Sequence, residues 1–199
     1  MAYPSKLTPK SILHAALPLV ESDGADTLNM RTLAVRLGVQ ASSLYRHYPD
    51  RAALLLAIEE QTTLALHTVM ANATEGVKHP AARLSAAAQA YLTYATEHPH
   101  LYALLLAPRP PTVATPGSGK NLWNLVLQLV GDVSGNPDDT ARTVVLWAYL
   151  HGFALLTLSG LLGLSGDQGG FQVGVDTLIN GFEAAKKRAE PNDSITPPC

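Results

Sequence analysis

Residues 28–51 decide the fold, and their sequence is LNMRTLAVRLGVQASSLYRHYPDR. Apolar residues recur at three- and four-residue spacing on both sides of Gly38, which indicates two short helices joined by a tight turn. We expect the first helix from Met30 to Leu37, capped by Asn29, and the second from about Ala41 to His47. The stretch therefore predicts a helix, a glycine turn and a second helix in close succession.

The segments on either side of this stretch also predict helices. Thr8-Pro9 combines a capping hydroxyl with a proline at the first helical position, and Asp23-Gly24 should end the helix that begins there. Pro18 lies inside that helix and should bend or shorten its last turns. Asp50 is a suitable cap for a long helix from Arg51 to Ala73.

The remaining chain keeps the helical apolar spacing, and alanine and leucine dominate it. We expect five further helices, near residues 80–97, 99–106, 119–133, 138–163 and 171–189. Segments 107–119 and 163–170 predict loops, and residues 190–199 predict a disordered tail. The fold class is therefore all-α with about nine helices, in a helix-turn-helix domain over residues 1–50 and a second helical domain over residues 51–189.

Composition limits the class of protein. The chain has 199 residues, 47% of them hydrophobic, and a single cysteine, Cys199, so no disulfide can form within one chain. No secretion signal is recognisable at the N-terminus, and we expect a cytoplasmic protein. The net charge is −2, but residues 1–51 carry six Lys/Arg against four Asp/Glu, whereas residues 52–199 carry eight against twelve. A small basic head on an acidic body is suited to binding phosphates locally.

One apolar segment allows a membrane alternative. Residues 144–164 contain no Asp, Glu, Lys or Arg and are long enough to cross a bilayer. The segment also contains His151, Thr157 and Ser159, and no basic cluster follows it. The alternative is a helix buried in a core or a subunit interface, and we expect no membrane.

The second helix of the 28–51 stretch has the chemistry of a groove-binding helix. Leu44 would anchor it inward, and its outward residues are small or hydrogen-bonding, which allows close approach to base edges. These outward residues are Gln40, Ala41, Ser42 and Ser43. Four further side chains could reach phosphates, namely Tyr45, Arg46, His47 and Arg51. The alternative is that two amphipathic helices simply pack through a glycine turn, with Tyr45 half-buried in the core.

The same residues closely resemble the TetR family of bacterial transcriptional regulators over about residues 7–56. The matching features are Met-Arg-x-Leu-Ala from Met30, Leu37-Gly38-Val39 and Ser-Leu-Tyr-x-His from Ser43, preceded by Leu-Thr-Pro-x-x-Ile-Leu-x-Ala-Ala from Leu7. Pro18 and Arg51 depart from the family pattern, since Arg51 stands where the family usually has lysine.

The resemblance implies a DNA-binding role for particular side chains. Ala41, Ser42 and Ser43 would contact bases, and Arg31 would add a base or backbone contact. Tyr45, His47 and Arg51 would lie on phosphates. Because Ala41 and Ser42 offer few hydrogen bonds, the operator sequence cannot be predicted from them.

The second half resembles the family's effector domains more loosely, through Trp147 and His151-Gly152, which look like the Trp…His-Gly motif of one subfamily. The resemblance implies a homodimer through helices 138–163 and 171–189. Val173, Val175, Leu178, Ile179 and Phe182 would complete that interface. A dimer would place two recognition helices about 34–36 Å apart, on a palindromic operator.

The resemblance also implies a small-molecule effector that releases a repressor from DNA by tilting the helix that begins at Arg51. The aromatic and apolar residues of the second half favour a mostly apolar ligand. Candidate pocket residues are His67, Met70, Tyr91, Tyr94, Trp123, Trp147 and His151. The alternative for each of them is ordinary core packing.

Catalytic and metal chemistry find little support. His98-Pro99-His100 lacks a third ligand at suitable spacing, and no nucleophile motif or phosphate-binding glycine loop occurs. We therefore expect no enzyme, no metal and no cofactor. Two other function classes stay open: a small-molecule carrier or sensor that has lost DNA binding, and a membrane-anchored protein.

Overall fold

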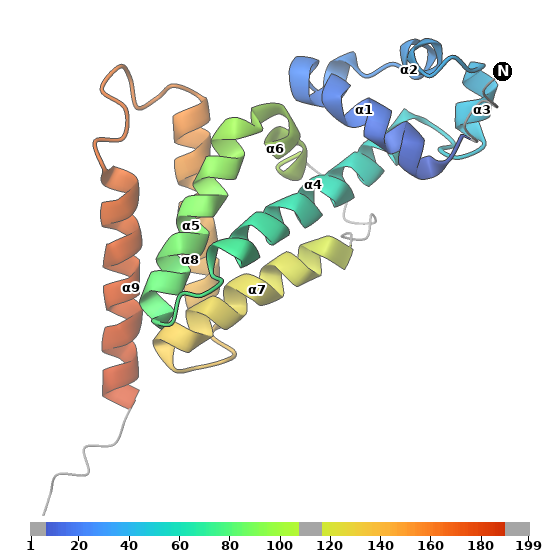
Figure 1. The fold of residues 1–199 in the computed structure, drawn as a ribbon. Helices are drawn as coiled ribbons and strands as arrows, with labels where there is room; N and C mark the ends of the chain where they lie inside the picture. The colour runs from blue at the N-terminus through green and yellow to red at the C-terminus, as the bar shows by residue number, and fades with distance from the viewer. Residues whose placement is uncertain (1–6, 108–116, 190–199) are drawn as a thin grey trace, which may run out of the picture. The chain divides into compact units, whose positions relative to one another are not determined.

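The computed structural model describes residues 7–107 and 117–189, and within them it contains no strand. Nine α-helices and one short 3-10 helix make up this described part of the chain (Figure 1). They are α1 (Pro9–Asp23), η1 (Ala25–Thr27), α2 (Met30–Arg36), α3 (Ala41–Tyr45), α4 (Arg51–Ala73), α5 (Pro80–Glu97), α6 (Pro99–Leu105), α7 (Gly117–Ser134), α8 (Thr140–Leu158) and α9 (Gly170–Ala189). The predicted all-α class is confirmed. Most of the predicted loop at 107–119 and the predicted tail at 190–199 lie outside the described residues.

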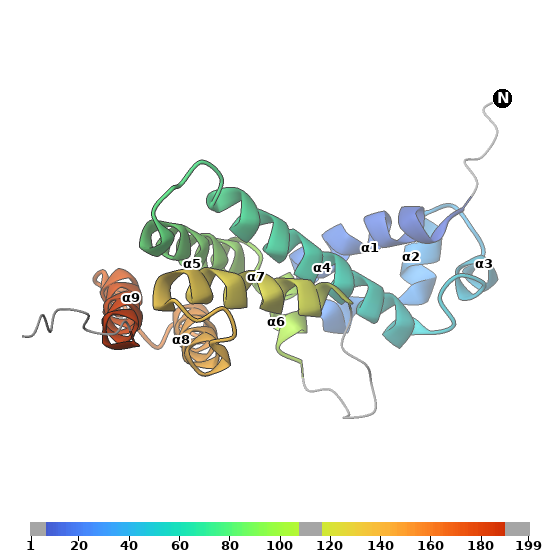
Figure 2. The same ribbon diagram turned by 90° about the horizontal axis from the view of Figure 1, so that it is seen from below.

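The helices form two compact units. The first contains α1, η1, α2, α3, α6 and the part of α4 up to Leu66. The second contains the rest of α4, nearly all of α5, α7 from Asn121 onward, α8 and α9. In the second unit, Figure 2 shows α8 and α9 running next to each other.

Helix α1 begins and ends as the sequence predicts. The Thr8 hydroxyl accepts a hydrogen bond from the Ser11 N–H at 3.1 Å, and the Ser11 hydroxyl accepts one from the Thr8 N–H in return. Gly24 ends the helix at a φ of +81°. Pro18 was expected to bend or shorten the last turns, and it does not shorten them, because α1 continues to Asp23. Its buried face packs on the core on both sides of the proline, through residues Ile12, Ala16 and Val20.

The turn between α2 and α3 depends on Gly38, whose φ is +67°. The left-handed backbone conformation at this position costs glycine little, whereas it costs any other residue about 1 kcal/mol. The turn closes through the N–H of Val39, which donates to the Ala34 carbonyl at 3.0 Å. Leu33 and Leu44 are fully buried beneath it. The three helices α1, α2 and α3 therefore share one core, which fixes how α3 is presented.

Several predicted helix ends differ by one or two residues, and one differs more. Helices α2 and α3 end at Arg36 and Tyr45, earlier than expected. Helix α8 ends at Leu158, whereas the sequence suggested residue 163. The reason is Gly160, which has a φ of +70° and stops the helix although apolar residues continue beyond it.

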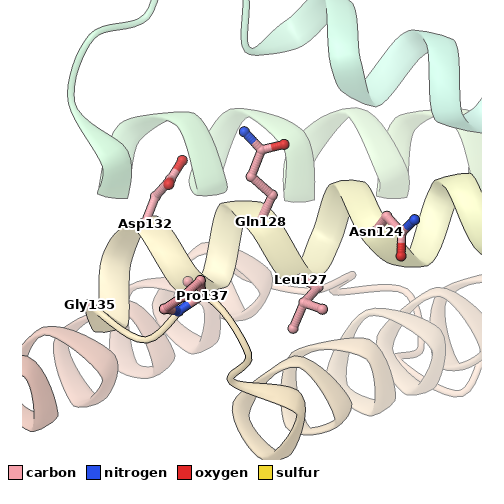
Figure 3. A pocket seen from close by; sticks show the side chains of 7 residues that line it. Asn124, Leu127, Gln128, Asp132, Gly135 and Pro137 are labelled. Carbon is pink, nitrogen blue, oxygen red and sulfur yellow. The ribbon is translucent and has the colours of Figure 1, made fainter.

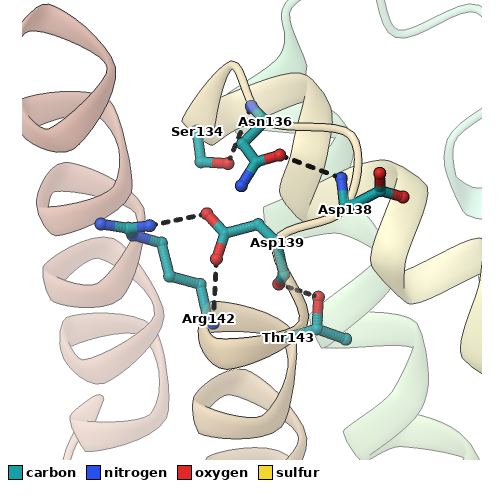
Figure 4. A network of polar contacts seen from close by, with 6 residues as sticks. All are labelled: Ser134, Asn136, Asp138, Asp139, Arg142 and Thr143. Carbon is teal, nitrogen blue, oxygen red and sulfur yellow. Dashed lines mark hydrogen bonds and ion pairs between the residues drawn. The ribbon is translucent and has the colours of Figure 1, made fainter. Parts of the chain in front are cut away.

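The start of α8 is held by a polar network in the second unit (Figure 4). The Asp139 carboxylate caps the helix, because it accepts the Arg142 N–H at 3.2 Å and the Arg142 guanidinium at 2.7 Å. Burial alone would raise the pKa of Asp139, but the hydrogen bonds from Arg142 and Ser134 outweigh it and lower that pKa. The carboxylate therefore stays charged and fixes the first turn of α8.

Helix α9 packs closely on α8 at a glycine. A Cβ added to Gly174 would overlap the hydroxyl and the ring atom Cζ of Tyr149 and lie 2.7 Å from its Cε2. The same hydroxyl donates to the Phe171 carbonyl at 2.8 Å. The absence of a side chain at residue 174 therefore allows the tyrosine to join the two helices.

Candidate nucleic-acid interface and effector site

Helix α3 presents one face to solvent and one to the core. Leu44 is 0% exposed and holds the helix inward, whereas Tyr45 is 47% exposed. Ser42 and Arg46 are also exposed, and Ala41 is half-buried against the core. Small polar side chains and a charged one therefore share the accessible face of a short helix, as binding in a DNA groove requires.

The other predicted contact residues lie around this face. Gln40 is exposed at the N-terminal end of α3 and makes no side-chain capping bond. Ser43 is half-buried, and its hydroxyl accepts a 3.3 Å hydrogen bond from the Arg46 guanidinium. His47 is half-buried after α3, while Arg31 is exposed in the first turn of α2. Most of the predicted DNA-contact residues therefore have accessible side chains, and their contacts with DNA stay predictions.

Arg51 differs from these residues, because its guanidinium already bonds main-chain carbonyls of its own chain, although the side chain is still 40% exposed. Its Nε donates to the Leu28 carbonyl at 2.9 Å, and one Nη donates to the Ala25 carbonyl at 2.6 Å. The short helix η1, which provides one of these carbonyls, was not predicted from the sequence. Its three residues carry no apolar periodicity, and the one local signal is the Asp26-Thr27 pair, since both residue types are common in turns.

Three of the seven candidate pocket residues form an aromatic cluster in the second unit. The ring centroids of Trp147 and His151 are 4.8 Å apart and nearly perpendicular, and those of Tyr91 and His151 are 5.5 Å apart. Tyr91 is completely buried, and its hydroxyl forms a hydrogen bond with Nδ1 of His151. The cluster joins α5 to α8 through residues that are 60 positions apart.

His151 is a neutral imidazole in this environment. Burial lowers its pKa from 6.5 to about 4. At neutral pH the cluster therefore carries no charge, although it contains the Tyr91 hydroxyl, the two ring nitrogens of His151 and the indole N–H of Trp147. Such a group of aromatic faces with a few polar atoms suits an apolar or aromatic ligand.

The remaining candidates are distributed differently. Met70 and Tyr94 are buried, and His67 and Trp123 are half-buried. A hollow of about 460 Å³ lies on α7 and the turn after it (Figure 3). None of the seven candidates lines it. Its lining residues are Asn124, Leu127, Gln128, Gly131, Asp132, Gly135 and Pro137.

An apolar face of α8 is exposed in the single chain. Its residues recur at helical spacing, and the large ones are 42–51% exposed. They are Val144, Val145, Leu155 and Leu156. The expected contribution of α9 is partly wrong, because Val175, Ile179 and Phe182 are buried within the chain itself. Val173, which is 66% exposed, is available on that helix.

Comparisons with known proteins agree with this geometry. The profile of bacterial regulatory proteins of the tetR family matches residues 12–58, and that of the tetracyclin repressor-like C-terminal domain matches residues 84–178. An uncharacterised HTH-type transcriptional regulator of Mycobacterium tuberculosis is 31% identical over 81% of this chain and 75% of its own length.

Two solved structures share the whole fold. A protein of unknown function from a Rhodococcus species has a TM-score of 0.79 and 28% identity, covering 90% of this chain and 98% of its own. A TetR variant from Acinetobacter baumannii, solved in complex with minocycline, has a TM-score of 0.68 and 25% identity, covering 91% of this chain and 99% of its own.

A glycine-turned pair of helices with an accessible polar face, joined to a helical body, defines a helix-turn-helix DNA-binding transcriptional regulator. The chain belongs to the TetR family of these regulators. The expectation that its body is of the Trp…His-Gly subfamily stays a prediction.

Proposed function

We propose that this protein is a dimeric repressor that binds a palindromic operator and is released from it by a small, mostly apolar ligand. The observation that carries the proposal is the face of α3, where Ser42, Tyr45 and Arg46 are exposed while Leu44 is locked into the core. A rigidly held helix with such a face can enter the major groove without rearrangement. On this proposal the DNA-binding head extends to about residue 50, and the helices after it bind the effector.

The exposed face of α8 supports the dimer. Leucine and valine side chains that are about half exposed over several turns are costly in water unless a partner covers them. In a twofold dimer the same face of a second copy covers them, because such an interface is self-complementary. Two heads held this way could contact successive major grooves about 34–36 Å apart.

The aromatic cluster supports the effector. Tyr91, Trp147 and His151 offer ring faces and a few polar atoms, which suits an aromatic ligand with a few hydrogen-bonding groups. The TetR variant from Acinetobacter baumannii was solved with minocycline, so a ligand of aromatic character has a precedent in a structural relative. Binding would act on DNA only if the ligand favours one position of α4 over another.

The α8 helix also bears on location in the cell. Among the described residues it is the one helix long and apolar enough to span a membrane by length and composition. One such helix is weak evidence, and the dimer explains its exposed face without a membrane. We propose a cytoplasmic protein, which recovery in the soluble fraction without detergent would support and recovery in the membrane fraction would contradict.

The decisive test of the function is selection of DNA from a random pool, followed by binding of the enriched duplex at several salt concentrations. The proposal expects a palindromic sequence and a salt-dependent affinity. Substituting Arg46→Gln should lower the slope of log affinity against log salt by about one phosphate contact. A protein that enriches no sequence would instead be the carrier or sensor class, for which the poor hydrogen-bonding capacity of Ala41 and Ser42 is the motivation.

We also propose that the protein is not an enzyme and that its ligand acts as an effector of DNA binding. A screen of aromatic compounds by thermal shift, with minocycline as a first probe, should find ligands that also weaken operator binding. By linkage, the operator must weaken the affinity of such a ligand by the same factor. A ligand whose affinity is unchanged by operator DNA would contradict release by an effector.

A further inference from the structure

The Arg51 side chain extends from the first turn of α4 back to the connection between α1 and α2. It bonds two main-chain carbonyls there, those of Leu28 at 2.9 Å and Ala25 at 2.6 Å. The nearby Asp26 carboxylate is 3.9 Å away and fully exposed, so it adds little to this arrangement. The carbonyls, and not the acid, are therefore the main partners of Arg51.

The two carbonyls belong to the segment that starts the helix-turn-helix. The Ala25 carbonyl also accepts the Leu28 N–H at 3.1 Å, which closes η1. Leu28 directly precedes Asn29, whose side chain caps α2 by accepting the Arg31 N–H at 2.8 Å. Arg51 therefore joins the first turn of α4 to the capping segment of α2, and α2 in turn packs on α3.

We propose that Arg51 is a positioning residue that sets the register of α4 against the helix-turn-helix, and that this is its main contribution to DNA binding. The inference rests on the proposed DNA-binding function. The planar guanidinium presents two N–H groups in fixed directions, and these match two carbonyls on one turn. Lysine has a single ammonium on a flexible stem and cannot reproduce both bonds in the same geometry.

This arrangement has a consequence for regulation. Because the guanidinium is bonded to the main chain, a displacement of the first turn of α4 beyond the reach of this side chain either breaks the bonds or moves the Leu28–Asn29 segment. The Asn29 cap of α2 and the position of α3 then shift together with α4. Arg51 therefore adds a polar connection to the buried contacts of Leu54 and Ile58, through which a shift in α4 reaches α2 and α3.

The test compares Arg51→Lys and Arg51→Gln with two controls. Asp26→Asn removes the exposed acid, and Arg46→Gln removes an exposed cation at the C-terminal end of α3. For each variant, affinity is measured by fluorescence anisotropy for the duplex selected by the wild-type protein and for a random-sequence duplex, over about 50–200 mM salt. The wild-type protein must first prefer the selected duplex, and its failure to do so would count against the proposed function itself.

Arg51→Lys should lose about tenfold affinity for the selected duplex, which corresponds to one charge-assisted hydrogen bond, and Arg51→Gln should lose at least as much because neither charge-assisted bond remains. They should keep the wild-type salt slope and lose less than about twofold on random DNA. Asp26→Asn should behave as the wild type, and Arg46→Gln should lower the slope by about one. Two results would overturn the proposal in favour of a phosphate contact. One is wild-type affinity in Arg51→Lys. The other is a salt slope that Arg51→Gln lowers by about one and that Arg51→Lys restores.

Hydrogen exchange of the free protein provides a readout that does not depend on DNA. The Arg31 amide, which the Asn29 cap protects, should exchange faster in Arg51→Lys than in Asp26→Asn. Arg51→Lys keeps the charge and most of the side-chain packing, so it serves if Arg51→Gln does not fold. Equal protection of the Arg31 amide in Arg51→Lys and the wild type would also overturn the proposal.

Discussion

Replacing His151 with asparagine should reduce the acid sensitivity of the protein. In the folded state burial lowers the pKa of His151 to about 4, whereas the unfolded chain titrates near 6.5. The unfolded state therefore takes up the proton first as the pH falls. His151 contributes a loss of stability that begins below about pH 6.5 and is complete near pH 4.

The magnitude follows from the two pKa values. Each unit of difference corresponds to 1.36 kcal/mol, so His151 alone lowers the free energy of unfolding by about 2 kcal/mol between pH 7 and about pH 4.5. Asparagine does not titrate, and its side-chain oxygen occupies the region of Nδ1, where the Tyr91 hydroxyl bonds. The variant therefore removes the titration while it keeps a hydrogen-bond acceptor.

The measurement is urea unfolding of both proteins at pH 7 and at about pH 4.5. Asparagine also removes ring contacts with Trp147, so the variant is less stable at both pH values. The prediction concerns only the difference: the wild type should lose about 2 kcal/mol more than the variant on acidification. An equal loss in the two proteins would refute the idea that His151 is buried as a neutral ring.

Three further substitutions test the fold and the dimer. Gly38→Ala should lower the free energy of unfolding, measured in urea, by about 1 kcal/mol because residue 38 has a φ of +67°. The space around it is open, so the cost is one of backbone conformation, and an unchanged urea midpoint would contradict this. Gly174→Ala should cost about 1–3 kcal/mol because a Cβ overlaps the packed tyrosine, whereas Gly181→Ala, where space is open, should cost nothing. Leu155→Glu should give a monomer in sedimentation, and Val35→Glu on α2, although 80% exposed in the wild type, should leave a dimer; dimers in both would contradict the α8 interface.

Helix α4 shows what local sequence predicts well. The capping aspartate at residue 50 accepts the Ala53 N–H at 2.7 Å, and the helix spans Arg51–Ala73 as expected. The turn at Gly38 was predictable for the same reason, since a single glycine between two apolar repeats is typical of a helix end followed by a turn. Local signals of this kind concern a residue and its near neighbours in the chain.

Helices α8 and α9 show where local signals end. Apolar spacing identified a buried face on α9, but spacing alone cannot tell whether the same chain or a partner buries it. Val175 and Ile179 proved to be covered by their own chain. The pairing of Tyr91 with His151, and the carbonyl partners of Arg51, also depend on distant parts of the chain. Residue types suggested these positions, and only the fold shows their partners.

The most direct test of the DNA-binding role is binding of the selected duplex by a Ser42→Glu variant. Ser42 lies on the exposed face of α3, so a carboxylate there should meet the acceptor-rich major groove and abolish sequence-specific binding. Gln61→Glu, which adds the same charge at an exposed position on α4, should bind as the wild type does. If Ser42→Glu binds the selected duplex with wild-type affinity, α3 is not the recognition helix and the central claim is contradicted.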